Sequence, residues 1–277
     1  MSSVKEKQLR HWNAVAEGWD TWFEWTVRNF ASLTDWFDRS GVWRPGTRVL
    51  DVACGSGYPA LVGATRVGST GRVVATDVSP AMLAVARRRA AARALANVEF
   101  VERDADDLQF DGESFDAVTN TYGLMFCDDI ARALLEARRV LKPGGRLAVA
   151  TWDDRSKSPF FTVIGGVAAD VLSLPQPASG EPGPFRLASS AALAQTLDDA
   201  GFSDVVVDNT AMTFELASPD EYCRIFSDLA WKSRLEALSG AEAARFTSAV
   251  GEAARPFIED GRLRLVATSV CAVGSRR

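Results

Sequence analysis

One stretch constrains the fold of this chain more than any other, an apolar run at residues 49–57 that ends in two glycines one residue apart. It reads Val49-Leu50-Asp51-Val52-Ala53-Cys54-Gly55-Ser56-Gly57, and helix-favouring residues follow it. This order predicts a strand, a tight turn and a helix. Because glycines let a backbone approach a ligand closely, and free N–H groups at a helix start favour an oxygen-rich group, we expect a ligand-binding turn.

Two kinds of ligand are candidates for this turn. Gly55-x-Gly57-x-x-Ala60 matches the dinucleotide fingerprint, and Asp77 stands where a ribose-binding carboxylate is expected. Asp51 argues against a dinucleotide, because a carboxylate inside the strand would repel a pyrophosphate and attract a cation. S-adenosylmethionine carries an ammonium and a sulfonium group and no phosphate. The turn therefore favours S-adenosylmethionine over NAD.

The composition narrows the class of protein. The 277 residues are 47% hydrophobic with a net charge of −5, which allows one large α/β domain and argues against nucleic acid or an anionic membrane as the main partner. Four dispersed cysteines and a single histidine indicate neither a zinc site nor a disulfide framework. The first residues lack the apolar core of a signal peptide, and no apolar run reaches membrane-spanning length. We expect a cytoplasmic protein with buried free thiols, no metal and no stable membrane association, and leave a homodimer open.

The segment from 48 to 152 alternates short β-branched runs with helical stretches, which is typical of a parallel sheet covered on both faces. A turn at Pro143-Gly144-Gly145 is expected to end the third helix. The predicted strands lie near 48–53, 72–77, 98–103, 115–121 and 146–152, and the predicted helices near 59–67, 80–95 and 128–141.

The flanking segments are more varied. Residues 5–39 are helical in pattern and rich in aromatic side chains, which either pack on the main domain or line a flat apolar pocket. A loop rich in proline and glycine is expected at 173–184. The other elements predicted after residue 152 are helices at 159–172, from Ser189 or Ser190 to Gly201, at 219–238 and at 240–254, and strands at 203–216 and 263–273.

Two acids stand at the ends of the next predicted strands. Asp77 and Asp104 follow strands whose carboxyl ends should converge with that of residues 48–53 on one crevice. Asp77 can accept hydrogen bonds from both hydroxyls of a ribose, and Asp104 can accept one from an exocyclic amine. The alternative, that each acid only caps a following helix or turn, stays open.

Together these segments resemble the class I S-adenosylmethionine-dependent methyltransferases, and within them the branch of the ubiquinone/menaquinone C-methyltransferases. The resemblance covers about residues 47–152, and residues 12–20 resemble the branch's short lid motif. It implies a Rossmann-like fold with a seven-stranded, mostly parallel sheet and helices on both faces, divided into a helical lid (1–44), a cofactor-binding core (45–152) and the remaining sheet with substrate-pocket helical insertions (153–277). The matching pieces are residues 49–57, 77–83, 104–108, 115–118 and 139–147.

The resemblance also assigns residues to the cofactor, S-adenosyl-L-methionine. Asp51 would lie near its amino group, Asp77 at the ribose, and Asp104 with Ala105 at the adenine amine. Ala53 departs from the glycine usual in the family, and we expect binding to tolerate the added methyl group. The full set of expected cofactor-binding residues is Trp19, Asp51, Ala53, Gly55, Gly57, Asp77, Val78, Met82, Asp104, Ala105, Asn120 and Tyr122.

The expected activity is methyl transfer to a small, apolar, aromatic or polycyclic metabolite at oxygen, nitrogen or carbon, as in natural-product tailoring. A quinone-pathway C-methyltransferase, a lipid-headgroup N-methyltransferase and a cofactor-binding regulatory module stay open as alternatives. His11 is the one candidate general base, because its ordinary pKa near 6.5 suits proton transfer at neutral pH. The alternative is that His11 is solvated or packs against Trp12.

Overall fold

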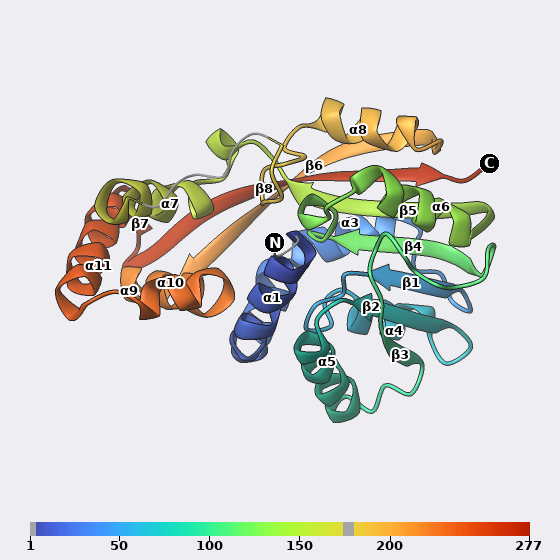
Figure 1. Ribbon diagram of the computed structural model, residues 1–277, viewed down its shortest axis with the longest axis horizontal. Helices are drawn as coiled ribbons and strands as arrows, with labels where there is room; N and C mark the ends of the chain where they lie inside the picture. Colours follow the sequence, from blue (N-terminus) through green and yellow to red (C-terminus); the bar gives the residue numbers. More distant parts are fainter. Residues whose placement is uncertain (1–3, 174–179) are drawn as a thin grey trace.

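A computed structural model describes residues 4–173 and 180–277, which are built around one central sheet (Figure 1). The strand order is β3-β2-β1-β4-β5-β8-β6, and β7 pairs with β8 as a short eighth strand. The first five strands are mutually parallel, whereas β8 runs antiparallel to both β5 and β6. The strands are β1 (Arg48–Val52), β2 (Arg72–Asp77), β3 (Val98–Glu102), β4 (Phe115–Thr121), β5 (Leu141–Trp152), β6 (Ser203–Leu216), β7 (Ile258–Glu259) and β8 (Arg262–Ser275).

Helices cover both faces of the sheet, which confirms the predicted fold class. The helices are α1 (Val4–Thr21), α2 (Phe23–Asn29), α3 (Ala31–Ser40), α4 (Ala60–Val67), α5 (Pro80–Ala92), α6 (Ile130–Val140), α7 (Pro159–Leu172), α8 (Ser190–Asp199), α9 (Pro219–Phe226), α10 (Lys232–Glu236) and α11 (Gly240–Ala254). One buried cluster joins α3, α4 and α5 to the sheet, and a second joins α6 and α8 to the opposite face.

The alternation of side chains along the central strands produces these two clusters. In β1, Val49 lies in the first cluster, whereas Leu50 and Val52 lie in the second. Successive side chains of a strand point to opposite faces, so a strand buried on both sides is apolar at nearly every position. Asp51 is the exception in β1, and its carboxyl group is therefore placed inside the protein.

The structure corrects the predicted start of β5. The strand begins at Leu141 and not near residue 146, so Pro143-Gly144-Gly145 lies within the strand. The segment forms an irregularity there, because the pairing with β4 shifts register and Gly144 has a φ of +75°. The C-terminal chain holds this segment, because Gly144 N donates to Arg276 O at 2.8 Å and Arg276 N donates to Gly145 O at 2.9 Å. The predicted loop at 173–184 lies partly outside the described residues.

Two other predictions need adjustment. The helix predicted at 219–238 is interrupted by a π-helical turn, Ser227–Trp231, between α9 and α10. All four cysteines are free, as predicted, but only Cys54 and Cys271 are buried, whereas Cys127 and Cys223 are partly exposed.

Strands β6 and β8 continue beyond the rest of the sheet. Residues 269–275 of β8 pair with β5, whereas residues 262–268 pair only with β6 and, at their end, with β7. This two-stranded arm carries α7, α9, α10 and α11 away from the central sheet, and α1 lies between those helices and α5 (Figure 1). The arm and α1 both lie at the carboxyl ends of the parallel strands.

Candidate functional site

A cavity of about 600 Å³ lies at the carboxyl ends of the parallel strands. Residues that follow β1, β2, β3, β4 and β5 all line it. Strand β1 has β2 on one side and β4 on the other, so the cavity sits where the strand order reverses, the usual ligand position in an open α/β sheet. Its volume is in the range of small-molecule sites.

The glycine turn forms one wall of this cavity. Gly55 has a φ of +53°, and a Cβ built on it would meet nothing within 4 Å, so its backbone faces open space. Gly57 plays another part, because a Cβ there would approach Leu61 Cδ1 at 3.0 Å and Ala86 Cβ at 3.4 Å. Gly55 therefore opens the turn toward the cavity, whereas Gly57 lets α4 and α5 pack closely behind it.

Asp77 is held in place by the turn that it faces. Its carboxylate accepts hydrogen bonds from Gly55 N at 2.9 Å and from Ser79 N at 2.8 Å. Burial raises the pKa of Asp77, and the same backbone N–H groups oppose that effect. Asp77 lines the cavity, as do Val78, which follows it, and Met82 in the first turn of α5.

Asp104 and Ala105 line the same end of the cavity, after β3. The Lys5 ammonium lies 2.9 Å from Asp104 Oδ2 and donates to Asp106 Oδ1 at 2.7 Å. Nine expected cofactor-binding residues thus line one cavity, and their contact with a cofactor stays a prediction. These nine are Trp19, Ala53, Gly55, Asp77, Val78, Met82, Asp104, Ala105 and Tyr122.

Asp51 lies behind the glycine turn and is not a lining residue. It is 1% exposed, and its Oδ1 accepts a hydrogen bond of 2.6 Å from the hydroxyl of Thr119, its neighbour on β4. Among the described residues its Oδ2 has no hydrogen bond of ordinary distance and angle, although the backbone N–H of Ala60 lowers the pKa of the carboxyl group. Burial raises the pKa of Asp51 from 3.8 to about 7, with a smaller contribution from the charge of Asp77. A positive charge in the cavity would favour the ionised form.

Three other predicted residues have structural positions outside the cavity lining. Gly57 packs against α4 and α5, as described above. Asn120 donates from Nδ2 to Val52 O at 3.1 Å and accepts from Leu124 N at 2.8 Å, which fixes the end of β4. His11 packs edge-on against Trp12, with ring centroids 4.8 Å apart, and burial lowers its pKa below 6.5, assisted by the charge of Arg234. This position matches the packing alternative for His11.

The opposite end of the cavity is aromatic, and we call it the aromatic end. The Tyr122 ring stacks on Trp152 with centroids 4.0 Å apart, and Phe160 stacks on Phe214 at the same distance. The aromatic end consists of Trp25, Phe30, Tyr122, Trp152, Phe160, Phe161, Phe214 and Phe226. Trp25 and Phe30 come from the aromatic segment 5–39, for which the sequence left a pocket-lining position open, and Tyr122 was expected at the cofactor. The other rings come from distant parts of the chain and were not predicted.

Ala53 occupies a conformation that usually requires glycine. Its φ is +58°, and a Cβ built on Gly123 would lie 2.4 Å from the Ala53 methyl group. The extra methyl group is therefore accommodated because residue 123 has no side chain.

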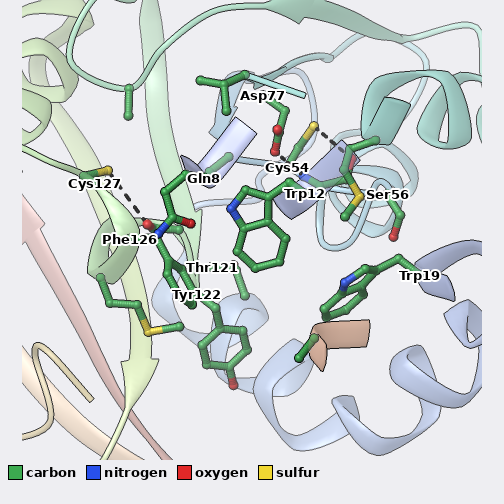
Figure 2. Close-up of a pocket in the computed structure, with 18 of the residues that line it drawn as sticks. Gln8, Trp12, Trp19, Cys54, Ser56, Asp77, Thr121, Tyr122, Phe126 and Cys127 are labelled. Atoms are coloured by element: carbon green, nitrogen blue, oxygen red, sulfur yellow. Dashed lines mark hydrogen bonds between the residues drawn. The ribbon is translucent and has the colours of Figure 1, made fainter. Parts of the chain in front are cut away.

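Helix α1 covers the cavity, and Figure 2 shows Trp12 near the middle of the view, with Asp77 and Cys54 on one side and Tyr122 and Phe126 on the other. The segment predicted as a lid is not uniform, however. Helix α3 belongs to the main core, where Leu33 and Phe37 are fully buried.

Within residues 4–173 and 180–277, no group of three or more histidine, cysteine or acidic side chains is arranged to hold a metal ion. In the same part of the chain, no helix is both long and apolar enough to cross a membrane.

Comparisons with known proteins agree with this architecture. Residues 28–161 match the model of the ubiE/COQ5 methyltransferase family. The chloroplastic 2-phytyl-1,4-beta-naphthoquinone methyltransferase of Arabidopsis thaliana is 41% identical over 135 residues, which are 48% of this chain and 51% of the relative. The ubiquinone/menaquinone biosynthesis C-methyltransferase UbiE of Ectopseudomonas mendocina is 48% identical over 111 residues, which are 40% of this chain and 43% of the relative. The chain thus spans about half the length of the curated relatives it matches.

The fold is also shared with solved structures. Phosphoethanolamine N-methyltransferase 2 of Haemonchus contortus, solved with S-adenosyl-L-methionine, superimposes with a TM-score of 0.54 at 22% identity, over 90% of this chain and 52% of that one. At that identity the likeness shows the fold alone. The chain thus has the fold of the class I S-adenosylmethionine-dependent methyltransferases, and its residues 28–161 match the ubiE/COQ5 methyltransferase family model.

Proposed function

We propose that this protein transfers a methyl group from S-adenosylmethionine to a small apolar acceptor. One observation carries the proposal: a single cavity joins the glycine turn and its acids to the aromatic end. A donor bound at the turn and an acceptor bound among the rings would then share one enclosed space. Holding two reactants in such a space supplies much of the rate enhancement of a displacement reaction.

The residues at the glycine turn suit the proposed donor. The open space at Gly55 accepts a ligand close to the backbone, and the Asp77 carboxylate borders the same space. Asp51 adds a buried acid whose Oδ2 has no hydrogen bond of ordinary distance and angle among the described residues, an arrangement that favours a cation and disfavours a pyrophosphate. When bound, S-adenosylmethionine supplies an electrophilic methyl group on a sulfonium.

The aromatic end would align the acceptor and exclude water. Its sole ionisable side chain is the Tyr122 phenol, which shares a 2.6 Å hydrogen bond with the Ser269 hydroxyl. Burial raises the pKa of Tyr122 well above 10, so this phenol stays protonated at neutral pH. Because these rings supply no base, the proposed acceptor arrives as a neutral amine, an ionised hydroxyl or an activated carbon.

A second candidate is C-methylation of a reduced quinone. It rests on the similarity of the core segment to methyltransferases whose names specify a naphthoquinone or ubiquinone/menaquinone biosynthesis. The arm with its helices lies outside the matched segment 28–161, apart from the first residues of α7. The quinone assignment is thus supported for the core and not for the acceptor pocket.

Within this function, we propose that the lid is α1 alone. Lys5, Trp12 and Trp19 of α1 line the cavity, whereas α3 is part of the core. A chain that begins at Trp22 should keep a cooperative unfolding transition and lose most of its affinity for S-adenosylhomocysteine. Unchanged affinity in calorimetry would show that α1 is no part of the site.

The proposed function is tested in two steps. Calorimetry should show binding of S-adenosylmethionine and S-adenosylhomocysteine and no binding of NAD. The protein is then incubated with donor labelled in its methyl group and with separate sets of phenols, amines and reduced naphthoquinones. Label should appear in an apolar aromatic product. Donor binding without transfer to any set would favour the regulatory alternative, and tight NAD binding would contradict the proposal.

A further inference from the structure

The π-helical turn Ser227–Trp231, called the π-turn below, forms a wall of the cavity. Leu229 and Ala230 from this turn line the cavity beside Ile225 and Phe226 from the end of α9. Isolated π-helical turns inside α-helices occur frequently at functional sites. Ala230 is the smallest side chain that the α9–π-turn segment places in the lining, and the same segment brings the rings of Phe226 and Trp231 together with centroids 5.2 Å apart.

The backbone of the π-turn rests directly on α1. A Cβ built on Gly18 would lie 2.1 Å from Asp228 O and 2.6 Å from Asp228 C. Both of those atoms belong to the backbone, so no side chain fits at position 18 unless the π-turn moves. The close approach at Gly18 thus fixes the distance between α1 and this wall of the cavity.

Two indole groups, one in the last turn of α1 and one just after α1, hold the π-turn in place. Trp19 Nε1 donates to the carbonyl oxygen of Leu229 at 3.1 Å, and Trp22 Nε1 donates to Asp228 Oδ2 at 2.8 Å. Trp19 also lines the cavity, so its ring and its hydrogen bond act on the same space. The carbonyl group that accepts this bond belongs to Leu229, and the next residue, Ala230, also lines the cavity.

We propose that the π-turn is the element that selects the acceptor by size, and that Trp19 is the positioning residue that fixes it. The inference rests on the proposed function, because it concerns the acceptor half of the same cavity. Ala230 leaves room for a second ring, and the Trp19 bond to Leu229 prevents the turn from relaxing into that room. The acceptor class is therefore an uncharged aromatic compound of at least two fused or linked rings.

The test uses the full-length protein and two probes for the aromatic end. 1-Naphthylamine, whose fluorescence responds to the polarity of its site, reports a two-ring ligand, and 4-methylphenol, measured by displacement, reports a one-ring ligand. S-adenosylhomocysteine, measured by calorimetry, reports the donor end independently. Ala230→Leu fills the proposed space, and Trp19→Phe keeps a ring while removing the donor to Leu229.

A matched control is available in Trp36→Phe. Trp36 Nε1 donates to Asp208 Oδ2 at 3.0 Å, and Trp36 is buried outside the cavity lining. The control therefore loses an indole hydrogen bond of similar length with no change at the π-turn. Thermal unfolding of all variants identifies any loss of affinity that follows from misfolding.

Ala230→Leu should weaken binding of the two-ring probe by about tenfold or more, as expected for overpacking, and leave the one-ring probe nearly unchanged. Trp19→Phe should reduce the preference for the two-ring probe by about fivefold, the effect of one hydrogen bond. Ala230→Leu should keep the affinity for S-adenosylhomocysteine within about threefold, and Trp36→Phe should match the wild type. Because Trp19 is itself an expected cofactor-binding residue, the effect of Trp19→Phe is measured as the ratio of the two probe affinities.

Two results would overturn the inference: equal loss of both probes in Ala230→Leu, or an unchanged probe preference in Trp19→Phe. Failure of the wild-type protein to bind the two-ring probe would do the same. Failure of the wild type to bind S-adenosylhomocysteine would instead overturn the proposed function, so the two failures are distinguishable.

Discussion

The buried carboxyl group of Asp51 should make the stability of this protein depend on pH in an unusual direction. Its pKa is about 7 in the folded chain against an ordinary 3.8. Between these two values the unfolded chain releases the proton and the folded chain keeps it, so stability falls as the pH rises. At about 1.4 kcal/mol for each pH unit, the interval corresponds to roughly 4 kcal/mol of folding free energy.

Asp51→Asn removes this dependence with little change of shape. The asparagine can keep the 2.6 Å hydrogen bond from the Thr119 hydroxyl, and it carries no charge at any pH. The free energy of unfolding of Asp51→Asn minus that of the wild type should therefore increase by roughly 4 kcal/mol from pH 4 to pH 8. Urea unfolding at several pH values measures this difference, and other titrating groups cancel in it to first order.

Thr119→Val provides the control for this experiment. Removal of the hydroxyl takes away a donor that favours the ionised form, so the pKa of Asp51 in the folded chain should rise further. The fall in stability should then begin at the same pH and extend to higher pH. A difference between Asp51→Asn and wild type that does not change with pH would refute the reasoning, because it would show that Asp51 ionises normally in the folded chain.

Three further outcomes are expected. Asp77→Ala should weaken S-adenosylhomocysteine binding in calorimetry by about 1–3 kcal/mol, because the turn and the ligand each lose a hydrogen-bond acceptor. His11→Ala should leave the methyl-transfer rate within about twofold, since the imidazole ring lies outside the cavity lining. A loss of about a hundredfold would instead indicate that His11 acts as a general base. Ala53→Gly should stabilise the protein by up to about 1 kcal/mol in thermal unfolding, because it relieves a left-handed alanine at a smaller entropic cost, and a loss of stability would contradict that account.

Most of the fold could be predicted from the sequence because its signals are local. The apolar runs and the glycine turn placed β1, β2 and β4, and Ser239 with Glu242 forms the complete capping box expected before α11. The start of β5 was missed because Pro143 and two glycines normally mark a turn, whereas here they form a bulge inside the strand, held by hydrogen bonds to the backbone of Arg276.

The candidate site was predictable where residues follow a strand end and much less so elsewhere. Asp77 and Asp104 line the cavity because parallel strands converge there. Asp51 lies one position before the end of β1, and its hydrogen bond comes from Thr119, a neighbour 68 residues away in sequence. The π-turn has no sequence signal, because it depends on the contact with Gly18 of a distant helix.

The two halves of β6 and β8 have different structural roles, and this affects how proteins of this fold can diversify. One half of each strand completes the sheet beside β5, and the other half carries the helices of the arm, including the π-turn. Insertions or substitutions in the arm can therefore reshape the acceptor pocket while the residues around the glycine turn keep their positions. A lineage of such enzymes can acquire new substrates without having to evolve a new way of holding the donor.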